Sequence, residues 1–250
     1  MTAVFGIEFC PHSKPDLVAL MTRDVPPSGE APRTVITTNL DHVACLPRNA
    51  DFREAYDRAW VVIADGMPVY LYARLRGAAP PARVPGADLL AALLRAVVPG
   101  RDRIFLVASD NQTAGRVRDY LIGRGFASDA VAWVAPSYGF EHDERYSALL
   151  SGQIRRFAAT HLILGVGSPK SEIWIDRHRD ALGSCYALSL GAGLEFFART
   201  KRRAPAWMSR CGFEWLWRLA HEPRRLSRRY LVSSWGFLGA IWRDLNPGHS

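Results

Sequence analysis

The chain has 250 residues, of which 48% are hydrophobic and 22% are charged, and its formal net charge is +8. This apolar content is enough to bury a sizeable core, which excludes an intrinsically disordered protein. The sequence has no uninterrupted apolar run of about 18 residues, and its first residues show no basic segment followed by a long apolar one. We therefore expect neither a transmembrane helix nor a secretory signal.

The first part of the chain alternates strand-like and helix-like segments. Six short runs rich in β-branched and apolar residues are predicted as strands: residues 34–38, 60–64, 104–108, 131–135, 162–165 and 186–190. Between them, residues 87–98 and 113–122 show the apolar spacing of helices. Continuous apolar strands that alternate with helices favour a mostly parallel sheet covered on both faces. The predicted fold is an open Rossmann-like α/β domain over residues 1–198.

The excess positive charge lies in the last part of the chain. Residues 1–198 contain 21 basic and 21 acidic residues, whereas residues 199–250 contain 11 basic and 3 acidic ones. Five of the eight tryptophans also lie in this second segment. We predict a helical, basic appendage that contacts an anionic surface, either phosphate-bearing lipid or nucleic acid. The α/β body is expected to fold without it.

Polar side chains at the ends of the first two strands are candidate site residues. Asp65 follows the second predicted strand and precedes a glycine, while Thr37 and Asn39 end the first. Ligands of open α/β sheets bind at the carboxyl ends of the strands, so Asp65 is a candidate general base whose basicity depends on its burial. For Asp65 and Asn39 a second interpretation stays open, in which each side chain caps the following helix.

Candidate phosphate-binding groups occur in three loops. Arg83 stands in a turn, and a guanidinium group can hold a phosphate through two parallel hydrogen bonds, although an ordinary surface arginine is the alternative. The glycine pairs Gly165/Gly167 and Gly191/Gly193 follow strands but lack the third glycine of GxGxxG and the GK[ST] ending of a P-loop. Such loops can present backbone N–H groups to a phosphate, and a plain tight turn explains them equally well.

No motif for a metal ion or a cofactor is present. The sequence lacks a DxD carboxylate pair, an HExxH pattern and a GxSxG elbow. We therefore expect a metal-free mechanism with no cofactor. The four cysteines include no CxxC pair and no zinc-finger spacing, so they are predicted to be reduced, mostly buried thiols of a cytosolic protein.

Several segments, taken in order, resemble one known family. They are TTNLDHV at residues 37–43, ADG at 64–66, RVPGAD at 83–88, LGVGSPKSEIWI at 164–175 and RAPAWMSRCGFEWLWRL at 203–219. This order resembles the WecG/TagA/CpsF glycosyltransferase family over about residues 30–235. The pairing of ADG with RVPGAD, together with the tryptophan-rich and arginine-rich end, makes the resemblance specific.

The resemblance implies an activity and a set of partners. The expected reaction transfers a hexose or N-acetylhexosamine, such as N-acetylmannosamine or glucose, from a UDP-sugar to a polyprenyl-diphosphate-linked saccharide. Inversion at the anomeric carbon and independence of metal are also implied, in the synthesis of a bacterial exopolysaccharide, capsule or cell-wall polymer. The enzyme is expected in the cytoplasm, bound peripherally to the anionic inner face of the cell membrane, with no nucleic acid as partner. Homo-oligomer formation stays open.

The resemblance also assigns roles to individual residues of the body. Asp65 matches the catalytic base, Thr37 and Asn39 match pocket residues near the sugar, and Arg83 lies in a turn expected near the phosphates. Three further substrate-binding candidates lie in the donor-side loops: Gly167, Ser171 and Glu195. Three positions in these loops differ from the usual family pattern. Ser171 stands where many members have the glutamine of PKQE, Glu195 where they have an aspartate, and Ser189 where they have a glycine. The loops therefore say little about which sugar is bound.

The appendage is expected to meet the lipid diphosphate and the membrane through five arginines: Arg218, Arg224, Arg225, Arg228 and Arg229. Residues 207–219 have the spacing of one helix with an aromatic face, and this face either meets the membrane or packs on the body as ordinary core. A second helix is predicted to begin at Glu222 and Pro223, because proline is well placed in a first turn.

Two other protein classes stay open. A nucleotide-dependent Rossmann oxidoreductase would show a complete GxGxxG after its first strand and an acidic residue about 20 positions later, and it would bind NAD(H). A non-enzymatic nucleic-acid binder would use the basic appendage and bind with strong salt dependence. The neutral body and the carboxylate at a strand end count against the second class.

Overall fold

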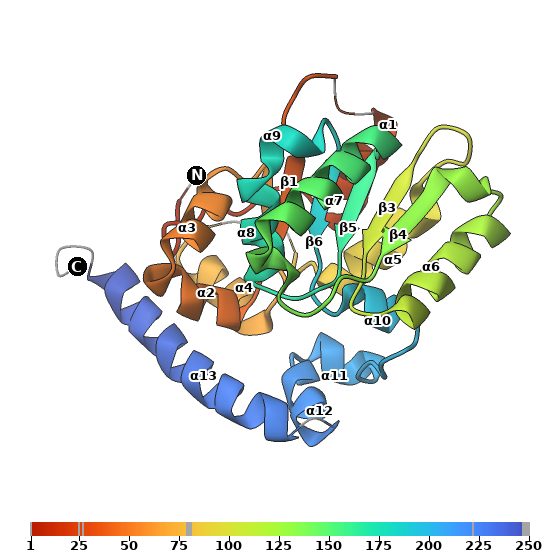
Figure 1. Cartoon of the computed structure of the whole chain (residues 1–250). Coiled ribbons are helices and arrows are strands. Elements are labelled where there is room, and N and C mark those ends of the chain that lie inside the picture. Colours follow the sequence, from red (N-terminus) through yellow and green to blue (C-terminus); the bar gives the residue numbers. More distant parts are fainter. Residues whose placement is uncertain (1, 25, 27, 79–81, 222, 247–250) are drawn as a thin grey trace.

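One parallel sheet forms the centre of the molecule. The computed structural model describes residues 2–24, 26, 28–78, 82–221 and 223–246, apart from the side chains of residues 206, 210, 218 and 224–232. Its strands are β1 (Arg33–Thr38), β2 (Val61–Ala64), β3 (Ile104–Val107), β4 (Val131–Val134), β5 (His161–Leu164) and β6 (Tyr186–Ser189). They pair in the order β2-β1-β6-β5-β3-β4, all parallel (Figure 1). The predicted α/β fold class and all six predicted strands are confirmed.

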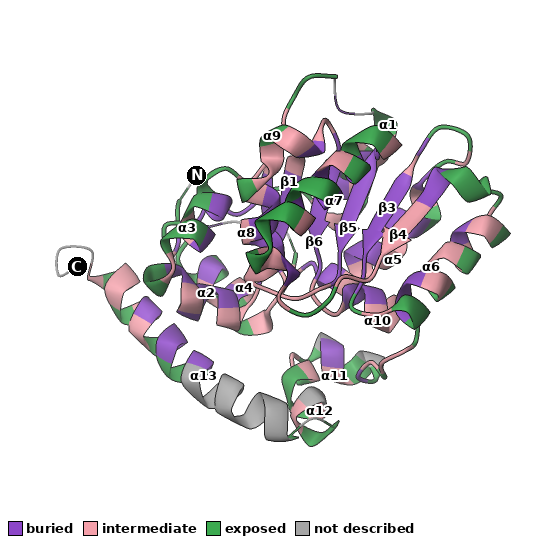
Figure 2. Cartoon of the chain, viewed as in Figure 1, coloured by how far each residue is buried: buried purple, intermediate pink, exposed green. Residues whose placement is uncertain are grey.

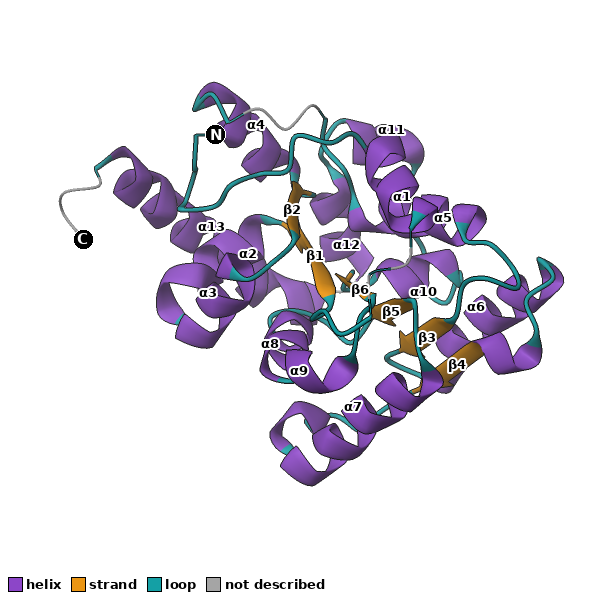
Figure 3. Cartoon of the chain, turned by 90° about the horizontal axis from the view of Figure 1, so that it is seen from above, coloured by secondary structure: helices purple, strands orange, loops and turns teal. Residues whose placement is uncertain are grey.

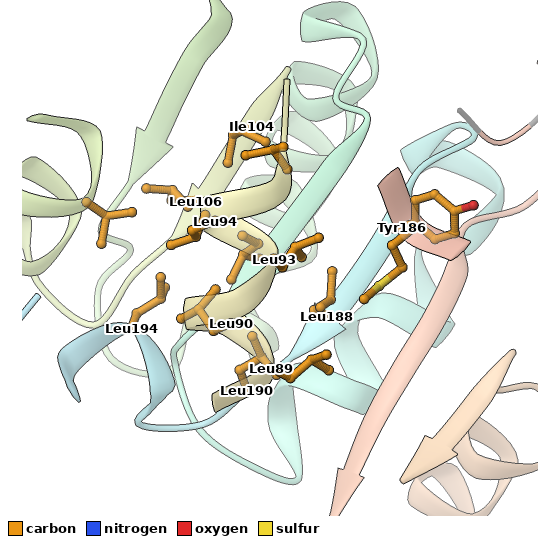
Figure 4. Close-up of a cluster of buried hydrophobic side chains, with 14 of the residues drawn as sticks. Leu89, Leu90, Leu93, Leu94, Ile104, Leu106, Tyr186, Leu188, Leu190 and Leu194 are labelled. Atoms are coloured by element: carbon orange, nitrogen blue, oxygen red, sulfur yellow. The ribbon is translucent and has the colours of Figure 1, made fainter. Parts of the chain in front are cut away.

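Four helices cover one face of the sheet: α1 (Lys14–Arg23), α5 (Gly86–Ala96), α6 (Asn111–Gly123) and α10 (Gly193–Phe197). Leu89, Leu90 and Leu93 of α5 are fully buried, as expected for an apolar stripe at helical spacing. They pack among side chains of β3 and β6, of which Leu188 is one (Figure 4). This packing fixes the start of α5 beside the carboxyl ends of β1 and β6.

Helices also cover the other face, in two groups. The helices α7 (Glu144–Phe157), α8 (Lys170–Arg177) and α9 (Arg179–Leu182) lie over β3 and β5. The helices α2 (Leu40–Cys45), α3 (Ala50–Asp57) and α4 (Met67–Leu75) lie at the β1 and β2 side. Three short 3₁₀ turns span Leu46–Arg48, Ser128–Ala130 and Phe140–His142. Figure 3 shows the resulting helix, sheet and helix layers, and Figure 2 shows that the strands are their buried centre.

The C-terminal segment folds as α11 (Ala206–Arg210), α12 (Glu214–His221) and α13 (Pro223–Leu245). The prediction of one helix over residues 207–219 is wrong, because the chain turns at Gly212, whose φ of 82° is left-handed. A Cβ atom at this position would lie 2.8 Å from Cγ of Met67, so the turn is also tightly packed against α4. The start of α13 at Pro223 agrees with the sequence.

The last turns of α13 are part of the core of the body. Gly236 lets the helix approach α2 so closely that a Cβ there would lie 2.7 Å from Cβ of Ala44. Phe237 is buried, and its ring lies 5.6 Å from that of Phe5. Asp244 accepts hydrogen bonds from the Phe5 backbone N–H at 2.6 Å and from a tyrosine hydroxyl of α4. A domain boundary after residue 198 stays a prediction, but residues 233–244 are anchored to the first unit.

Two sequence expectations concern the surface and the thiols. In the described part of the chain, no helix has both the length and the apolar character to span a membrane.

All four cysteines are free thiols, of which Cys10 and Cys185 are buried while Cys45 is half-buried and Cys211 is exposed. The expectation of mostly buried thiols therefore holds for two of the four.

Candidate active site

A polar cleft of about 320 Å³ lies at the carboxyl ends of the strands. Its wall comes from the loops after β1, β2, β3, β5 and β6, as the strand-end rule predicts, and from the segment that leads to α11. Five of the predicted site residues line it: Thr37, Asn39, Asp65, Gly167 and Glu195. Five charged or titratable lining residues were not among the predicted site residues: His42, Glu172, Lys201, Arg203 and Glu214.

Asp65 is held at the cleft by its backbone. Its N–H donates to the carbonyl oxygen of Thr38 at 2.9 Å, at the end of the β1–β2 pairing. The helix that follows has Gly66 at its N-cap and no side-chain cap, so the capping interpretation of Asp65 is wrong. Asp65 is half-buried and lines the cleft.

Thr37 and Asn39 line the cleft from the end of β1 while they also support the backbone. The Thr37 hydroxyl donates to the carbonyl oxygen of Ser189 at 3.2 Å and so ties β1 to β6. The Asn39 side chain accepts from the N–H groups of Asp41 at 2.9 Å and His42 at 3.3 Å. The capping interpretation of Asn39 is therefore confirmed, and its amide nitrogen is the part that can meet a ligand.

Two predicted substrate contacts do not line the cleft. The Arg83 guanidinium donates to the carbonyl oxygens of Asp65 at 3.4 Å and Ser209 at 2.7 Å, so it links the loop after β2 to α11. Ser171 is buried, and its hydroxyl donates to the carbonyl oxygen of Gly167 at 2.8 Å. Both side chains hold the backbone of lining loops. Direct substrate contact by either stays a prediction.

The glycines of the two strand-end loops leave backbone free to approach a ligand. Gly167 has a φ of 98° and Gly191 a φ of 51°, both left-handed, and a Cβ at either position would meet no atom within 4 Å. Position 165 requires glycine for a different reason, because a Cβ atom there would lie 2.6 Å from a Leu194 side-chain atom. It allows α10 to pack on the end of β5.

Cations reach the cleft from the segment between α10 and α11. The Lys201 ammonium lies 2.9 Å from Glu195, which also accepts from the Ser109 hydroxyl at 3.2 Å. The Arg203 guanidinium lies 2.6 Å from Asp88, and its buried Nε has no hydrogen-bond partner among the described residues. Burial lowers the pKa of Arg203, but the nearby carboxylates, that of Asp65 included, raise it by more. Arg203 therefore brings a permanent positive charge near the Asp65 carboxylate.

A second carboxyl group lies at the buried end of the cleft. Glu172, in the first turn of α8, is 2% exposed, and its Oε1 lies 4.0 Å from Nε2 of His42, which is 4% exposed. The other imidazole nitrogen of His42 lies 2.7 Å from the Tyr56 hydroxyl, which in turn lies 3.0 Å from the Thr38 hydroxyl. These four residues form a buried polar chain that ends at the cleft, which we call the Glu172 chain.

Burial raises the pKa of Glu172 to about 7, against smaller opposing effects of its own backbone N–H and of the Ser168 side chain. The Glu172 carboxylate also affects the pKa values of its neighbours. The pKa of the Tyr56 hydroxyl and that of the Cys45 thiol are raised mainly by burial, and the Glu172 carboxylate raises them further. Glu172 thus titrates near neutral pH inside the folded protein.

Glu172→Gln is expected to remove a pH-dependent loss of stability. The raised pKa means that the folded protein binds this proton more tightly than the unfolded chain does. The resulting stabilisation is complete below about pH 4.5 and is lost as the pH rises through about 7. At about 1.4 kcal/mol per pH unit, wild type should lose roughly 3 kcal/mol relative to Glu172→Gln between pH 4.5 and 8.

Urea unfolding of both proteins at pH 5 and pH 8 measures this difference. Glu141→Gln is a matched control, because Glu141 also has a buried carboxylate oxygen without a hydrogen-bond partner among the described residues. A gap between wild type and Glu172→Gln that is the same at both pH values would contradict the prediction.

Within the described ranges, no three His, Cys, Asp or Glu side chains come together as a group that could hold a metal ion. Metal independence itself stays a prediction. The cleft combines a carboxylate at one strand end, cations from the segment between α10 and α11, and open glycine loops. On an open parallel sheet this combination is typical of an enzyme active site that favours an anionic ligand.

Comparison with known proteins gives the particular family. The sequence pattern of the glycosyl transferase WecG/TagA/CpsF family matches residues 2–249, so the chain belongs to this family and is a glycosyltransferase. This decides among the three classes that the sequence left open. Similar proteins include two N-acetylglucosaminyldiphosphoundecaprenol N-acetyl-beta-D-mannosaminyltransferases of Staphylococcus aureus, from strains MRSA252 and MW2. They are 27% and 26% identical over 199 residues, which cover 78% of this chain and 74% of each relative.

Proposed function

We propose that the protein transfers a hexose or N-acetylhexosamine from a UDP-sugar to a polyprenyl-diphosphate-linked saccharide, with inversion and without a metal ion. The observation that carries this proposal is the placement of Asp65 and Arg203 in one cleft, a proton acceptor and a permanent cation near each other. The names of the relatives support the acceptor class, because they specify a sugar on diphosphoundecaprenol. The product would be an intermediate of a bacterial surface polymer.

The proposed reaction is a single displacement at the anomeric carbon of the donor. An acceptor hydroxyl oxygen forms the new bond to this carbon while the bond to the UDP oxygen breaks on the opposite face. The leaving UDP takes the bonding electrons, and the Asp65 carboxylate takes the hydroxyl proton. One carboxylate is sufficient for this inverting route, because no covalent enzyme intermediate has to form.

The negative charge that grows on the leaving diphosphate needs compensation from the protein. Lys201 and Arg203 are the lining cations in the described part of the cleft, and arginine can hold a phosphate through two hydrogen bonds. The open loops at Gly167 and Gly191 add backbone N–H groups. In this arrangement Thr37 and Asn39 lie beside the sugar. Arg83 and Ser171 hold the loops that make the contacts.

The proposed function is tested by measuring UDP release. The protein is incubated with a panel of UDP-sugars and a synthetic polyprenyl-diphosphate disaccharide or monosaccharide acceptor, with and without EDTA. We expect acceptor-dependent UDP release with one or a few donors, at a rate that EDTA leaves unchanged. Strict dependence on Mg²⁺ or Mn²⁺ would overturn the metal-free mechanism, and the absence of release with every donor would overturn the donor class.

We also propose that the outer side of α13 binds the membrane surface. Trp235, Leu238, Trp242 and Leu245 are spaced three, four and three residues apart, so they form one stripe on the side away from α2. Trp235 is 73% exposed and Trp242 is 54% exposed. Tryptophan is well suited to a membrane interface, since it has an apolar ring and a polar N–H.

Basic residues are expected to accompany this surface. The side chains of five arginines lie outside the described residues: Arg218, Arg224, Arg225, Arg228 and Arg229. Their contact with lipid diphosphate and anionic lipid stays a prediction, at about 1 kcal/mol per residue near the surface. The exposed tryptophans support peripheral binding independently of these side chains.

Replacing Trp235 and Trp242 with Ser is expected to lower binding to vesicles of phosphatidylglycerol and phosphatidylethanolamine by roughly 10-fold or more, because two apolar rings no longer leave water. Co-sedimentation at low and moderate salt measures the effect. Leu149→Ser is the control, since Leu149 is 62% exposed on α7, on another part of the surface. Equal binding of the double variant and wild type would remove this stripe from the membrane contact.

A further inference from the structure

The Glu172 chain contains a carboxyl oxygen without a hydrogen-bond partner among the described residues, although the Ser168 side chain lies close enough to the same carboxyl group to lower its pKa. Glu172 lines the cleft, yet its carboxyl group is almost completely withdrawn from solvent. Its Oε2 atom is buried and has no hydrogen-bond partner in the described part of the structure. A buried carboxyl oxygen without a partner is costly, and such groups in native proteins usually have a ligand or a catalytic reason.

We propose that Glu172 binds the donor sugar, with Oε2 accepting a hydrogen bond from one sugar hydroxyl or amide N–H, and so selects which sugar is transferred. This inference rests on the proposed function and names a specificity-determining residue for it. The Glu172 carboxylate would repel the diphosphate of the donor. The group that it binds is therefore a hydrogen-bond donor of the sugar. The cations Lys201 and Arg203 mark the phosphate part of the same cleft.

The depth of Glu172 assigns it to the donor and not to the acceptor. Asp65 is half-buried, whereas Glu172 is 2% exposed, so Glu172 is the less accessible of these two carboxyl groups of the cleft lining. A lipid-linked saccharide must approach from the open side, and its attacking hydroxyl has to reach Asp65. The donor sugar is therefore the part of the reaction that can fill the space in front of Glu172.

The polar chain behind Glu172 limits where the carboxyl group can lie. His42 faces its Oε1 atom at 4.0 Å, and the bond from His42 to the Tyr56 hydroxyl fixes the imidazole ring. Tyr56 is in turn bound to Thr38 at 3.0 Å. With Oε1 facing the imidazole, Oε2 is the atom left for a ligand. A rigid acceptor in a buried site discriminates strongly against a ligand that lacks the matching donor group.

Kinetics with single-position donor analogues test this assignment. Wild type and Glu172→Gln are compared on the preferred UDP-sugar and on analogues of it that each lack one hydroxyl or the amide group. At pH 8, where Glu172 is mostly ionised, we expect Glu172→Gln to lower kcat/KM for the preferred donor by about 10- to 100-fold, the loss expected for a charged hydrogen-bond partner. For one analogue, the one that lacks the bound group, the two enzymes should differ by less than about 3-fold.

Controls separate binding from folding. Inhibition by UDP alone should be equal for wild type and Glu172→Gln, because UDP does not reach the Glu172 chain, and both proteins should melt cooperatively. Glu141→Gln carries the same atomic change at a half-buried carboxylate outside the cleft lining, which has one buried oxygen without a partner among the described residues, and should keep the wild-type donor preference. Glu172→Ala should show the same analogue dependence as Glu172→Gln.

The outcomes are distinguishable. A loss by Glu172→Gln that is equal for every donor and analogue, or no loss at all, overturns the specificity role while the proposed function stands. A wild-type protein that neither binds UDP nor releases it from any donor overturns the proposed function, and the role of Glu172 with it. Loss confined to donors that carry one particular group supports the assignment.

Discussion

Replacing Asp65 with Asn is expected to lower kcat by about 10²- to 10⁴-fold, which is the usual contribution of a general base. The amide has the same shape as the carboxylate, but it cannot accept the proton of the acceptor hydroxyl. The backbone contact of residue 65 with Thr38 does not involve the side chain and should remain. Binding of UDP is therefore expected to change by no more than a few-fold.

A second strand-end aspartate provides the matched control for this experiment. Asp110 follows β3, but its side chain accepts from the Thr113 N–H at 2.7 Å and caps α6, and it does not line the cleft. Asparagine is an equally good N-cap, so Asp110→Asn should keep the wild-type rate within about 2-fold. The comparison uses UDP release under single-turnover conditions. If the two variants have similar activity, Asp65 is not the base.

Phe237→Ala is expected to destabilise the whole protein by about 3–5 kcal/mol, the range for a large aromatic side chain removed from a core. Phe237 lies on α13 but packs with Phe5 against the β1 and β2 side of the body. The effect should appear as one cooperative transition with the midpoint lowered by roughly 6–20 °C, at about 2–4 °C per kcal/mol for a chain of this size.

Leu238→Ala is the control for the same helix. Leu238 is the neighbouring residue and is 56% exposed, so its truncation should change stability by less than about 1 kcal/mol. The melting temperatures of Phe237→Ala and Leu238→Ala are compared with that of wild type. Equal melting temperatures would mean that the end of α13 adds nothing to the body and that residues 199–250 are separable, as the sequence suggested. If Phe237→Ala shows the predicted loss of stability, a chain that ends before residue 199 should expose an apolar surface and fold poorly.

The location of the site was predictable, but part of its composition was not. Asp65, Thr37 and Asn39 were found because a strand end can be identified from apolar runs, and parallel strands bring their carboxyl ends to one edge. Lys201 and Arg203 were counted with the basic appendage, because the sequence KRRAP at residues 201–205 is separated from the end of α10 by three residues. Nothing local indicates that this segment turns back over the cleft, where Arg203 meets Asp88, 115 positions earlier.

Glu172 and His42 illustrate the same limit within the body. Both stand in motifs that the family resemblance brought forward, so their presence near the site could have been inferred. Their burial and the missing partner of Oε2 depend on how α2, α3 and α8 pack together, which no spacing within one segment reveals. A single buried carboxyl group is not visible in sequence, because glutamate is usually exposed.

The sequence by itself determined the alternation of strands and helices, the parallel sheet and the edge at which the cleft lies. These follow from local apolar periodicity, which each segment of about ten residues carries within itself. Only the tertiary structure decided that Gly212 breaks the predicted helix, that α13 ends in the core and that two cations and a buried carboxyl group complete the cleft. These features arise from contacts between residues far apart in the chain, whose free energies depend on the folded packing and not on local preference.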